Sequence, residues 1–271
     1  MPEGHVIHRL ARELTAAFGG REVRVSSPQG RFASEADRLD GSGFVVGEAC
    51  GKHLFLSFDV PEPSGVHIHL GLIGKLRIRD LAEPVGVVRL RIADGAVAAD
   101  LHGPQWCRAV TLEQWAGVMA ASGPDPLRPD ADPERGWAKI RRSAKPIAAL
   151  LMDQKIAAGV GNIYRAEVLF RHRVDPMAPG DGLRRATWQA MWDDLAVLMA
   201  DGVETGRIDT LLPEHMPEAT GRAARDDPHG GEVYVYRRAG QPCLICGTAV
   251  QSSSLAGRNL YWCPRCQRRK R

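Results

Sequence analysis

Long apolar runs are absent from this chain of 271 residues: no segment is long enough to cross a membrane, and the N-terminus has no apolar signal stretch. No internal repeat is evident, and the formal net charge of +4 is too small to indicate a partner by itself. We therefore expect a cytoplasmic protein whose six cysteines stay reduced. A length of 271 residues is ample for two domains with separate cores.

Four of the cysteines form two pairs with the spacing of a metal site. Cys243 and Cys246 make one CxxC pair, Cys263 and Cys266 make the other, and residues 247–262 separate them. Thiolate sulfurs at this spacing bind one tetrahedral zinc ion. Two disulfides in a secreted domain are the alternative, which the missing signal stretch disfavours. The intervening residues predict two short strands around a glycine-bearing turn, and therefore a zinc-clamped hairpin.

Basic residues dominate the end of the chain. Residues 257–271 include no acidic residue and six basic ones: Arg258, Arg265, Arg268, Arg269, Lys270 and Arg271. Such a surface suits phosphate groups. For residues 268–271, a solvated basic tail is an equally good interpretation. Charge is uneven elsewhere too, because residues 139–173 carry eight basic groups against two acidic ones, whereas residues 174–235 are acidic.

The start of the chain, Met1-Pro2-Glu3-Gly4, indicates a different chemistry. Removal of Met1, which the small Pro2 permits, would leave a secondary amine with a pKa of about 8, so that part of it is neutral at physiological pH. A neutral amine can attack an aldehyde-like carbon to give an iminium, and the adjacent Glu3 can move protons. Taken alone, these residues also fit an ordinary chain start.

Proline and glycine divide the chain into parts. Residues 124–134 are rich in proline and predict a linker. We therefore expect a first domain at 1–123, a second domain at 135–232 and a zinc finger at 233–271. A second loose segment covers about residues 213–232.

The first domain predicts an antiparallel sheet with one helix. Residues 5–18 carry apolar side chains at helical spacing, and a helix packed on the sheet would anchor the chain start. His67 and His69 share the strand face opposite the apolar residues; a metal role is conceivable, and solvent-exposed histidines are the commoner outcome. Half-buried strands are predicted where apolar and polar residues alternate, at residues 65–70, 75–79 and 88–92.

The second domain predicts two helices around a glycine-containing turn. The first helix begins near Pro146 and breaks at residues 157–161. Asn162 predicts the N-cap of the second helix, which ends at Arg171. Backbone N–H groups at such a turn, together with the helix dipole, favour the binding of an anion.

Three segments resemble the formamidopyrimidine-DNA glycosylase/endonuclease VIII family: residues 2–4, residues 154–170 and residues 235–243, which run into the paired cysteines. The matches span nearly the whole chain in order, and the Pro-Glu-Gly start looks like the endonuclease VIII branch of actinobacterial type. The resemblance implies an α+β multidomain fold. Its parts are an N-terminal β-sandwich with a leading helix, a helix–two-turn–helix domain and a C-terminal zinc-ribbon hairpin.

The resemblance also implies a bifunctional DNA glycosylase and apurinic or apyrimidinic site lyase of base excision repair. Pro2 would attack C1′ of a damaged nucleotide turned out of the helix, the base would leave, and β- and then δ-elimination of the flanking phosphates would follow. Oxidised pyrimidines and abasic sites are the expected substrates. The expected partner is damaged double-stranded DNA, with single-stranded or forked DNA as an alternative, bound by a nucleoid-associated monomer that holds one structural zinc ion.

The matched motifs carry the family's residue roles onto this chain. Leu72, within residues 71–74, is expected to fill the space that the extruded nucleotide leaves. Three of the residues also have a purely structural interpretation: Lys52 as a surface lysine, Asn162 as a plain helix cap and Arg258 as a hairpin arginine. The roles are catalysis for Pro2, Glu3 and Lys52, and DNA binding for Leu72, Lys155, Asn162 and Arg258.

The chain departs from the family pattern at residues 103–107, where the arginine–phenylalanine pair that the other branch uses to hold the estranged base is absent. His5 and Val6 also replace residues common in that branch. Oxidised purines therefore remain an alternative substrate, and a non-catalytic damage-binding protein on the same scaffold is an alternative function. Cys50 and Cys107 fit no motif and are expected to be buried as small apolar residues.

Overall fold

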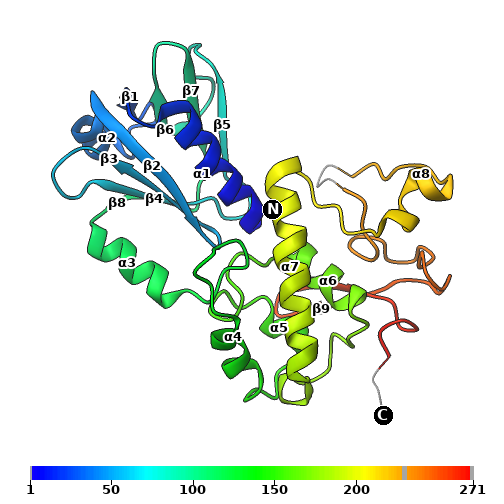
Figure 1. Ribbon diagram of the computed structural model, residues 1–271. Helices are drawn as coiled ribbons and strands as arrows, with labels where there is room; N and C mark the ends of the chain where they lie inside the picture. The colour runs from blue at the N-terminus through cyan, green and yellow to red at the C-terminus, as the bar shows by residue number, and fades with distance from the viewer. Residues whose placement is uncertain (1, 228–230, 269–271) are drawn as a thin grey trace. The chain divides into compact units, whose positions relative to one another are not determined.

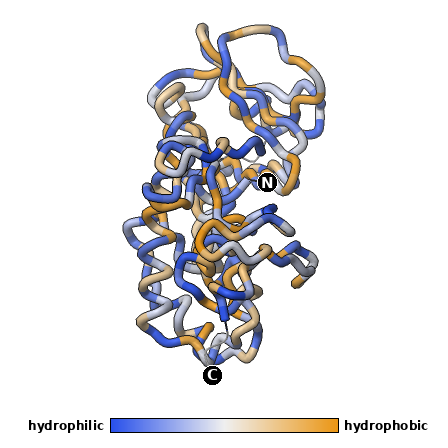
Figure 2. Tube along the Cα trace, turned by 90° about the vertical axis from the view of Figure 1, so that its right-hand side faces the viewer, coloured by the Kyte–Doolittle hydropathy of each residue, from blue (hydrophilic) through white to orange (hydrophobic). Residues whose placement is uncertain are grey.

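The computed structural model describes residues 2–227 and 231–268, and the chain forms two compact units that divide between residues 121 and 122 (Figure 1). Each unit has its own apolar core. Figure 2 shows hydrophobic and hydrophilic residues interleaved at short intervals along the trace. Among the described residues, no helix is both long and apolar enough to cross a membrane. Met1 and the basic residues 269–271 lie outside the described residues.

The first unit is built on an eight-stranded antiparallel sheet in the order β5-β7-β6-β1-β2-β3-β4-β8. Its helices are α1 (Gly4–Phe18), α2 (Ala33–Leu39) and α3 (Leu112–Ala121). Its strands are β1 (Arg21–Ser26), β2 (Ser42–Cys50), β3 (His53–Phe58), β4 (Gly65–His69), β5 (Lys75–Asp80), β6 (Val88–Ala93), β7 (Val97–His102) and β8 (Trp106–Val110). The predicted helix and the three predicted strands are therefore confirmed as α1, β4, β5 and β6.

Strand β1 joins the two halves of this sheet. Its residues 21–23 pair with β2, and its residues 24–26 pair with β6. Apolar side chains from both halves meet those of α1 in a single core, as expected for a sheet that folds over on itself. Leu14 and Phe18 of α1 are fully buried in this core, which accounts for the helical spacing of apolar residues in the sequence.

A close approach between α1 and β2 fixes the helix on the sheet. The Gly47 N–H donates to Thr15 Oγ1 at 2.8 Å, and the same hydroxyl donates to the Ala11 carbonyl at 2.8 Å. A Cβ atom at position 47 would lie 2.9 Å from the Ala11 carbonyl oxygen, so only glycine fits there. At the other end of the helix, the Gly20 N–H donates to the Phe44 carbonyl at 2.9 Å.

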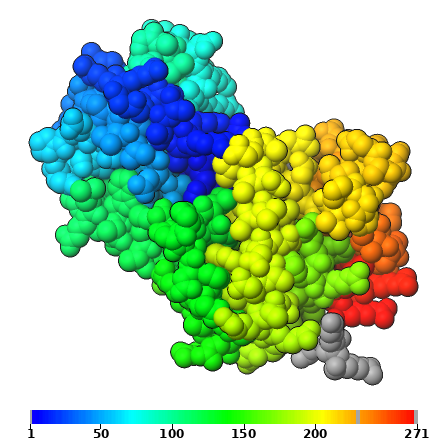
Figure 3. All heavy atoms as spheres, viewed as in Figure 1, coloured from blue at the N-terminus to red at the C-terminus, as the bar shows by residue number. Residues whose placement is uncertain are grey.

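The second unit is mainly helical and ends in a two-stranded hairpin. Its described elements are α4 (Pro133–Ile140), α5 (Ile147–Leu150), α6 (Asn162–Arg171), the 3-10 turns Gly180–Gly182 and Pro213–His215, α7 (Arg185–Thr205), α8 (Pro217–Thr220), β9 (Gln251–Leu255) and β10 (Arg258–Trp262). The predicted hairpin is confirmed, with Ala256 and Gly257 at its turn. The longest helix, α7, buries one side through Trp188, Met191 and Leu195, while its other side is part of the molecular surface (yellow in Figure 3).

Two predictions for the second unit were wrong in detail. The first helix covers only residues 147–150, because the chain then continues as a series of turns up to residue 161. Asn162 is not an N-cap: Gly161 takes that position, and Asn162 is the first residue of α6. Its side chain is directed to the hairpin instead, where its amide donates to the Asn259 carbonyl at 2.9 Å.

The buried carboxylate of Glu167 connects α6 to the segment that leads into the hairpin. It accepts from the backbone N–H groups of Tyr234, Val235 and Tyr236 at 2.7, 2.9 and 2.8 Å, and from Thr210 Oγ1 at 2.7 Å. Glu167 is fully inaccessible to solvent. Buried backbone donors need acceptors, and one side chain supplies all four of these bonds.

We expect Glu167→Gln to lower the free energy of unfolding by about 3 kcal/mol, because a neutral amide has one acceptor oxygen and turns an N–H₂ group toward the remaining donors. Urea denaturation at 25 °C measures this loss. The control is Glu218→Gln, at an exposed position of α8, which should change the stability by less than about 0.5 kcal/mol. Equal stabilities for the two variants would contradict the role assigned to Glu167.

Candidate functional site

The chain start is held by the first turn of α1. Glu3 precedes the helix, is fully buried, and its carbonyl accepts from the Val6 N–H at 3.0 Å. Pro2 is half-buried. Burial, followed by nearby positive charge that includes Arg9, lowers the pKa of His5 to about 4 and keeps that side chain neutral.

The contacts of α1 place this first turn near the end of β2. Three residue-to-residue steps along the strand, from Gly47 to Cys50, span about 10 Å, which is the rise of about seven helix residues. Since Ala11 lies against Gly47, the helix residues beside Cys50 are those of the first turns. Figure 1 shows α1 running along β2, with the N-terminus marked at the end of the helix.

Strand register brings two further predicted residues to the same end of the sheet. Cys50 pairs with His53, so that Lys52 lies in the tight turn between β2 and β3. His69, the last residue of β4, pairs with Trp106, the first residue of β8. We call this region, which comprises residues 51–53, 69–74 and 103–106, the Lys52 end of the sheet. The sequence could not reveal that these segments meet, because only the register of β3, β4 and β8 brings them together.

Leu72 lies at the exposed tip of the loop between β4 and β5. Its side chain is 55% exposed, and that of Ile73 is 78% exposed. The loop is held at its base, because the Gly71 N–H donates to His69 Nδ1 at 3.1 Å and the Gly74 N–H donates to the Leu70 carbonyl at 3.0 Å. An apolar side chain on a well-anchored loop is suited to insertion between stacked aromatic groups.

The predicted exposure of His67 and His69 was wrong. His67 is fully buried and His69 is partly buried, because rings from β3, β8 and α3 cover this face of the sheet. Trp106 stacks on His69 with ring centroids 4.5 Å apart, and Phe55 stacks on His67 at 4.5 Å. The alternating His-x-His pattern was the only sequence signal of this cluster.

Of the two cysteines outside the pairs, Cys50 is buried, as predicted, and Cys107 is only partly buried. Burial raises the pKa of the Cys107 thiol to about 12, so this residue is an inert thiol at neutral pH.

In the second unit, Asn162 and Arg258 come together through the hairpin. The Asn259 carbonyl, adjacent to Arg258, accepts from the Asn162 amide and from the guanidinium of Arg165, each at 2.9 Å. Arg165 also donates to Asn162 Oδ1. The start of α6 and the first residues of β10 are therefore held side by side.

The basic stretch at residues 139–173 separates into structural and surface groups. Arg165 is fully buried, and Arg171 forms a bidentate ion pair with Asp194 at 2.7 Å, so neither is available for a distant anion. Lys155 is exposed, and its carbonyl accepts from Lys139 Nζ at 2.6 Å. Lys155 therefore remains as an exposed cation on the turn that precedes α6.

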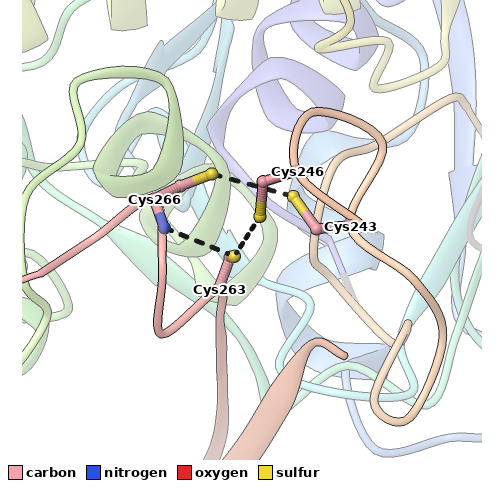
Figure 4. Close-up of side chains that lie close together, drawn as sticks. All are labelled: Cys243, Cys246, Cys263 and Cys266. Carbon is pink, nitrogen blue, oxygen red and sulfur yellow. Dashed lines mark hydrogen bonds between the residues drawn. The ribbon is translucent and has the colours of Figure 1, made fainter. Parts of the chain in front are cut away.

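The four paired cysteines form one compact site, and Figure 4 shows their sulfur atoms directed toward one another. All four Sγ atoms lie within 4.8 Å of one another; Cys243 and Cys266 are 3.9 Å apart, and Cys246 and Cys263 are 3.5 Å apart. Tetrahedral zinc with bonds of about 2.3 Å requires sulfur atoms about 3.8 Å apart. The site therefore fits one zinc ion, which would hold the two ends of the hairpin together.

Three family descriptions match the chain. Residues 1–103 match the formamidopyrimidine-DNA glycosylase N-terminal domain, residues 122–212 match the formamidopyrimidine-DNA glycosylase H2TH domain, and residues 240–269 match the zinc finger found in FPG and IleRS. Between them, these matches account for most of both units.

Individual relatives agree with these matches. The chain is 47% identical to endonuclease 8 1 of Mycobacterium tuberculosis over 276 residues, which cover 98% of this chain and 100% of that protein. It is similar to the structure of the MutM (FPG) protein of Thermus thermophilus, with 26% identity, a TM-score of 0.74 and 98% of both chains covered. Lactococcus lactis Fpg in complex with an abasic site containing DNA has the same fold, with 22% identity, a TM-score of 0.78, and 98% of this chain and 100% of that chain covered.

We expect Cys263→Ser to lose the zinc ion and the ordered hairpin, because three thiolates no longer close the tetrahedron and the metal supplies much of the folding free energy of so small an element. Metal analysis of the purified protein should fall from about one zinc per chain to nearly none, and limited proteolysis should cut within residues 240–268. Cys107→Ser, which is outside the site, serves as the control and should retain its zinc. A Cys263→Ser protein with full zinc content would refute the four-cysteine assignment.

Proposed function

The chain belongs to the formamidopyrimidine-DNA glycosylase and endonuclease VIII family, and from that premise we propose that it removes oxidised pyrimidines from DNA through the amine of Pro2 and then cleaves the strand. It is a DNA glycosylase of base excision repair and an apurinic or apyrimidinic site lyase. The observation that carries the proposed chemistry is the convergence of the chain start, Lys52 and the Leu72 loop at one end of the sheet.

The roles in the first unit follow from this arrangement. With Met1 removed, the Pro2 nitrogen attacks C1′ of the extruded nucleotide and the bond to the base breaks. The C1′–O4′ bond of the sugar then opens, with a proton delivered to O4′, and the resulting iminium allows β- and then δ-elimination of the flanking phosphates. Glu3, a buried carboxyl group next to the amine, moves the protons. Lys52 binds a phosphate beside the lesion, and Leu72 fills the space in the base stack.

The roles in the second unit concern binding. We assign phosphate contacts to Lys155 on the exposed turn and to Arg258 at the start of β10. For Asn162, which is buried and donates one amide hydrogen to the Asn259 carbonyl, we assign the contact to the second amide hydrogen. Because the Asn162 side chain binds the hairpin carbonyl, this residue also holds Arg258 in place. In this division, residues 1–123 carry the catalysis, residues 124–134 connect the units, and residues 135–232 and 233–271 bind chromosomal DNA in the nucleoid.

The nucleophile is tested by a variant that retains one residue before Pro2. The Pro2 nitrogen then becomes an amide, and the new amine lies about 3.5 Å away, so borohydride trapping on abasic duplex should fall by at least about 100-fold. Mass spectrometry of both proteins establishes which residue begins each chain. Lesion binding should remain largely intact, because no binding group has been removed.

Full trapping by the blocked protein would move the Schiff base to a lysine and refute the assignment to Pro2. Absence of trapping by a correctly processed wild-type protein would favour a protein that binds damage without catalysis. Running the same assay with thymine glycol and with an oxidised purine decides between the two substrate classes.

The salt dependence of DNA affinity distinguishes residues that bind phosphate from a residue that fills the base stack. Arg258→Ala should weaken binding to damaged and undamaged duplex alike and reduce the slope of log affinity against log salt by about one unit. Leu72→Ala should leave that slope unchanged and slow excision from duplex more than from single strands, where no stack needs filling. Leu112→Ala, in α3, is a matched control for Leu72 because the two leucines are 60% and 55% exposed. If Leu72→Ala leaves the ratio of duplex to single-strand rates unchanged, Leu72 does not fill the stack.

A further inference from the structure

A chain of hydrogen bonds crosses three strands at the Lys52 end of the sheet. His67 Nε2 lies 3.0 Å from His53 Nδ1, and on its other side His67 Nδ1 lies 3.3 Å from a guanidinium nitrogen of Arg108. The three residues come from β3, β4 and β8, and His67 pairs directly with Arg108 in the sheet. Nothing in the roles proposed above uses any of them.

Arg108 determines which atom donates and which accepts in each of these hydrogen bonds. A guanidinium group only donates hydrogen bonds, so His67 Nδ1 must accept. The hydrogen of neutral His67 is then on Nε2, which donates to His53 Nδ1. His53 in turn accepts at Nδ1 and carries its own hydrogen on Nε2. An exposed arginine therefore determines the tautomer of a histidine two strands away.

Both histidines are held neutral by their surroundings. Burial, followed by the charges of His53, Arg108 and His69, lowers the pKa of His67 to about 3. Burial, followed by the charges of His69, Arg108 and Lys52, lowers the pKa of His53 to about 4. Neither ring gains a proton in the physiological range, so the direction of the hydrogen bonds does not change there.

The His53 ring is also fixed in orientation. Its centroid lies 5.1 Å from that of His67, 5.3 Å from that of His69 and 6.2 Å from that of Trp106, whose ring plane is inclined to it by 28°. The ring is half-buried, and its described hydrogen bond uses only Nδ1. Its backbone neighbour is Lys52, at the turn where we place the phosphate beside the lesion. A rigid neutral N–H donor therefore lies next to a cation at the proposed DNA surface.

We propose that His53 is a second DNA phosphate-binding residue beside Lys52, and that Arg108 and His67 are positioning residues that keep its Nε2 hydrogen available for donation. The phosphate contact rests on the proposed function, whereas the tautomer is a property of the free protein. The two parts are therefore tested separately.

The tautomer is read from long-range ¹H–¹⁵N spectra of the full chain with labelled histidine and without DNA. Wild-type His53 should give the pattern of a neutral ring protonated at Nε2 across pH 6 to 8. Arg108→Met, which removes the donor at an exposed position, should release His67 and give a mixture of tautomers at His53. His67→Phe, a planar replacement in the same stack, should do the same. A wild-type His53 protonated at Nδ1, or an Arg108→Met protein with the wild-type pattern, would overturn the relay.

The phosphate contact is measured as duplex affinity across a salt series. His53→Phe keeps the stacking and loses the donor, so affinity for a duplex with a stable abasic-site analogue should fall roughly three- to tenfold with an unchanged salt slope. Lys52→Met should lower affinity and reduce the slope by about one unit, because it removes a charge that displaces counterions. His102→Phe, on β7, is the matched histidine control and should bind as the wild type does.

Each binding result has one interpretation. Unchanged affinity in His53→Phe would overturn the contact, and a slope reduced by about one unit would show that His53 binds as a cation, against the proposal. If the wild-type protein itself does not prefer the damaged duplex, the proposed function fails while the tautomer result stands.

Discussion

The carboxylate of Glu167 is the interaction on which the second unit depends. Three of its four hydrogen bonds join the middle of α6 to residues 234–236, which lead to the first cysteine pair, and the fourth joins it to Thr210. Without this acceptor, three consecutive buried N–H groups would have no partner, at a cost of about 1–3 kcal/mol each. The zinc hairpin thus begins from a backbone segment whose position α6 has already determined.

A second set of contacts completes this arrangement. The start of α6 binds the Asn259 carbonyl through Asn162 and Arg165, so one helix holds the hairpin at its entrance and near its turn. A zinc ion bound by the four cysteines would hold the two ends of the hairpin together. The Glu167 carboxylate, the contacts to the Asn259 carbonyl and the four-cysteine site therefore act at three different positions of the C-terminal segment. The orientation of Arg258 depends on all three of these interactions.

Much of the fold could be predicted from local patterns, and the failures have a common cause. Alternating residues identified β4, β5 and β6, and the paired cysteines identified the hairpin, because period and spacing are properties of short segments. The Asn162 cap was predicted wrongly because its side chain has a partner 97 residues away, which no local rule contains. Helix α7 was not predicted, although Trp188, Met191 and Leu195 follow a helical period.

The proposed site is a set of residues that motifs in the sequence indicate, and its arrangement comes only from the structure. Pro2, Lys52 and Leu72 were identified from motifs, whereas their common location depends on the register of four strands and on the seating of α1. His53, His67 and Arg108 were outside the prediction altogether, since their hydrogen bonds depend on which rings the sheet brings together. The residue type determines what chemistry a side chain can perform, and the strand register determines which side chains lie close together.

The contact of Thr15 and Ala11 with Gly47 also determines where this chain tolerates changes in length. An added residue in the turns between β1 and β2, which are outside this contact, leaves the distance from Pro2 to Lys52 unaltered. One added residue between Gly4 and Ala11 rotates the beginning of the helix by about 100° and turns the amine away from the end of the sheet. Variation in length among proteins of this kind should therefore be found outside the segment from Pro2 to Thr15 and the segment from Gly47 to Lys52, which together set the distance from the amine to the lysine.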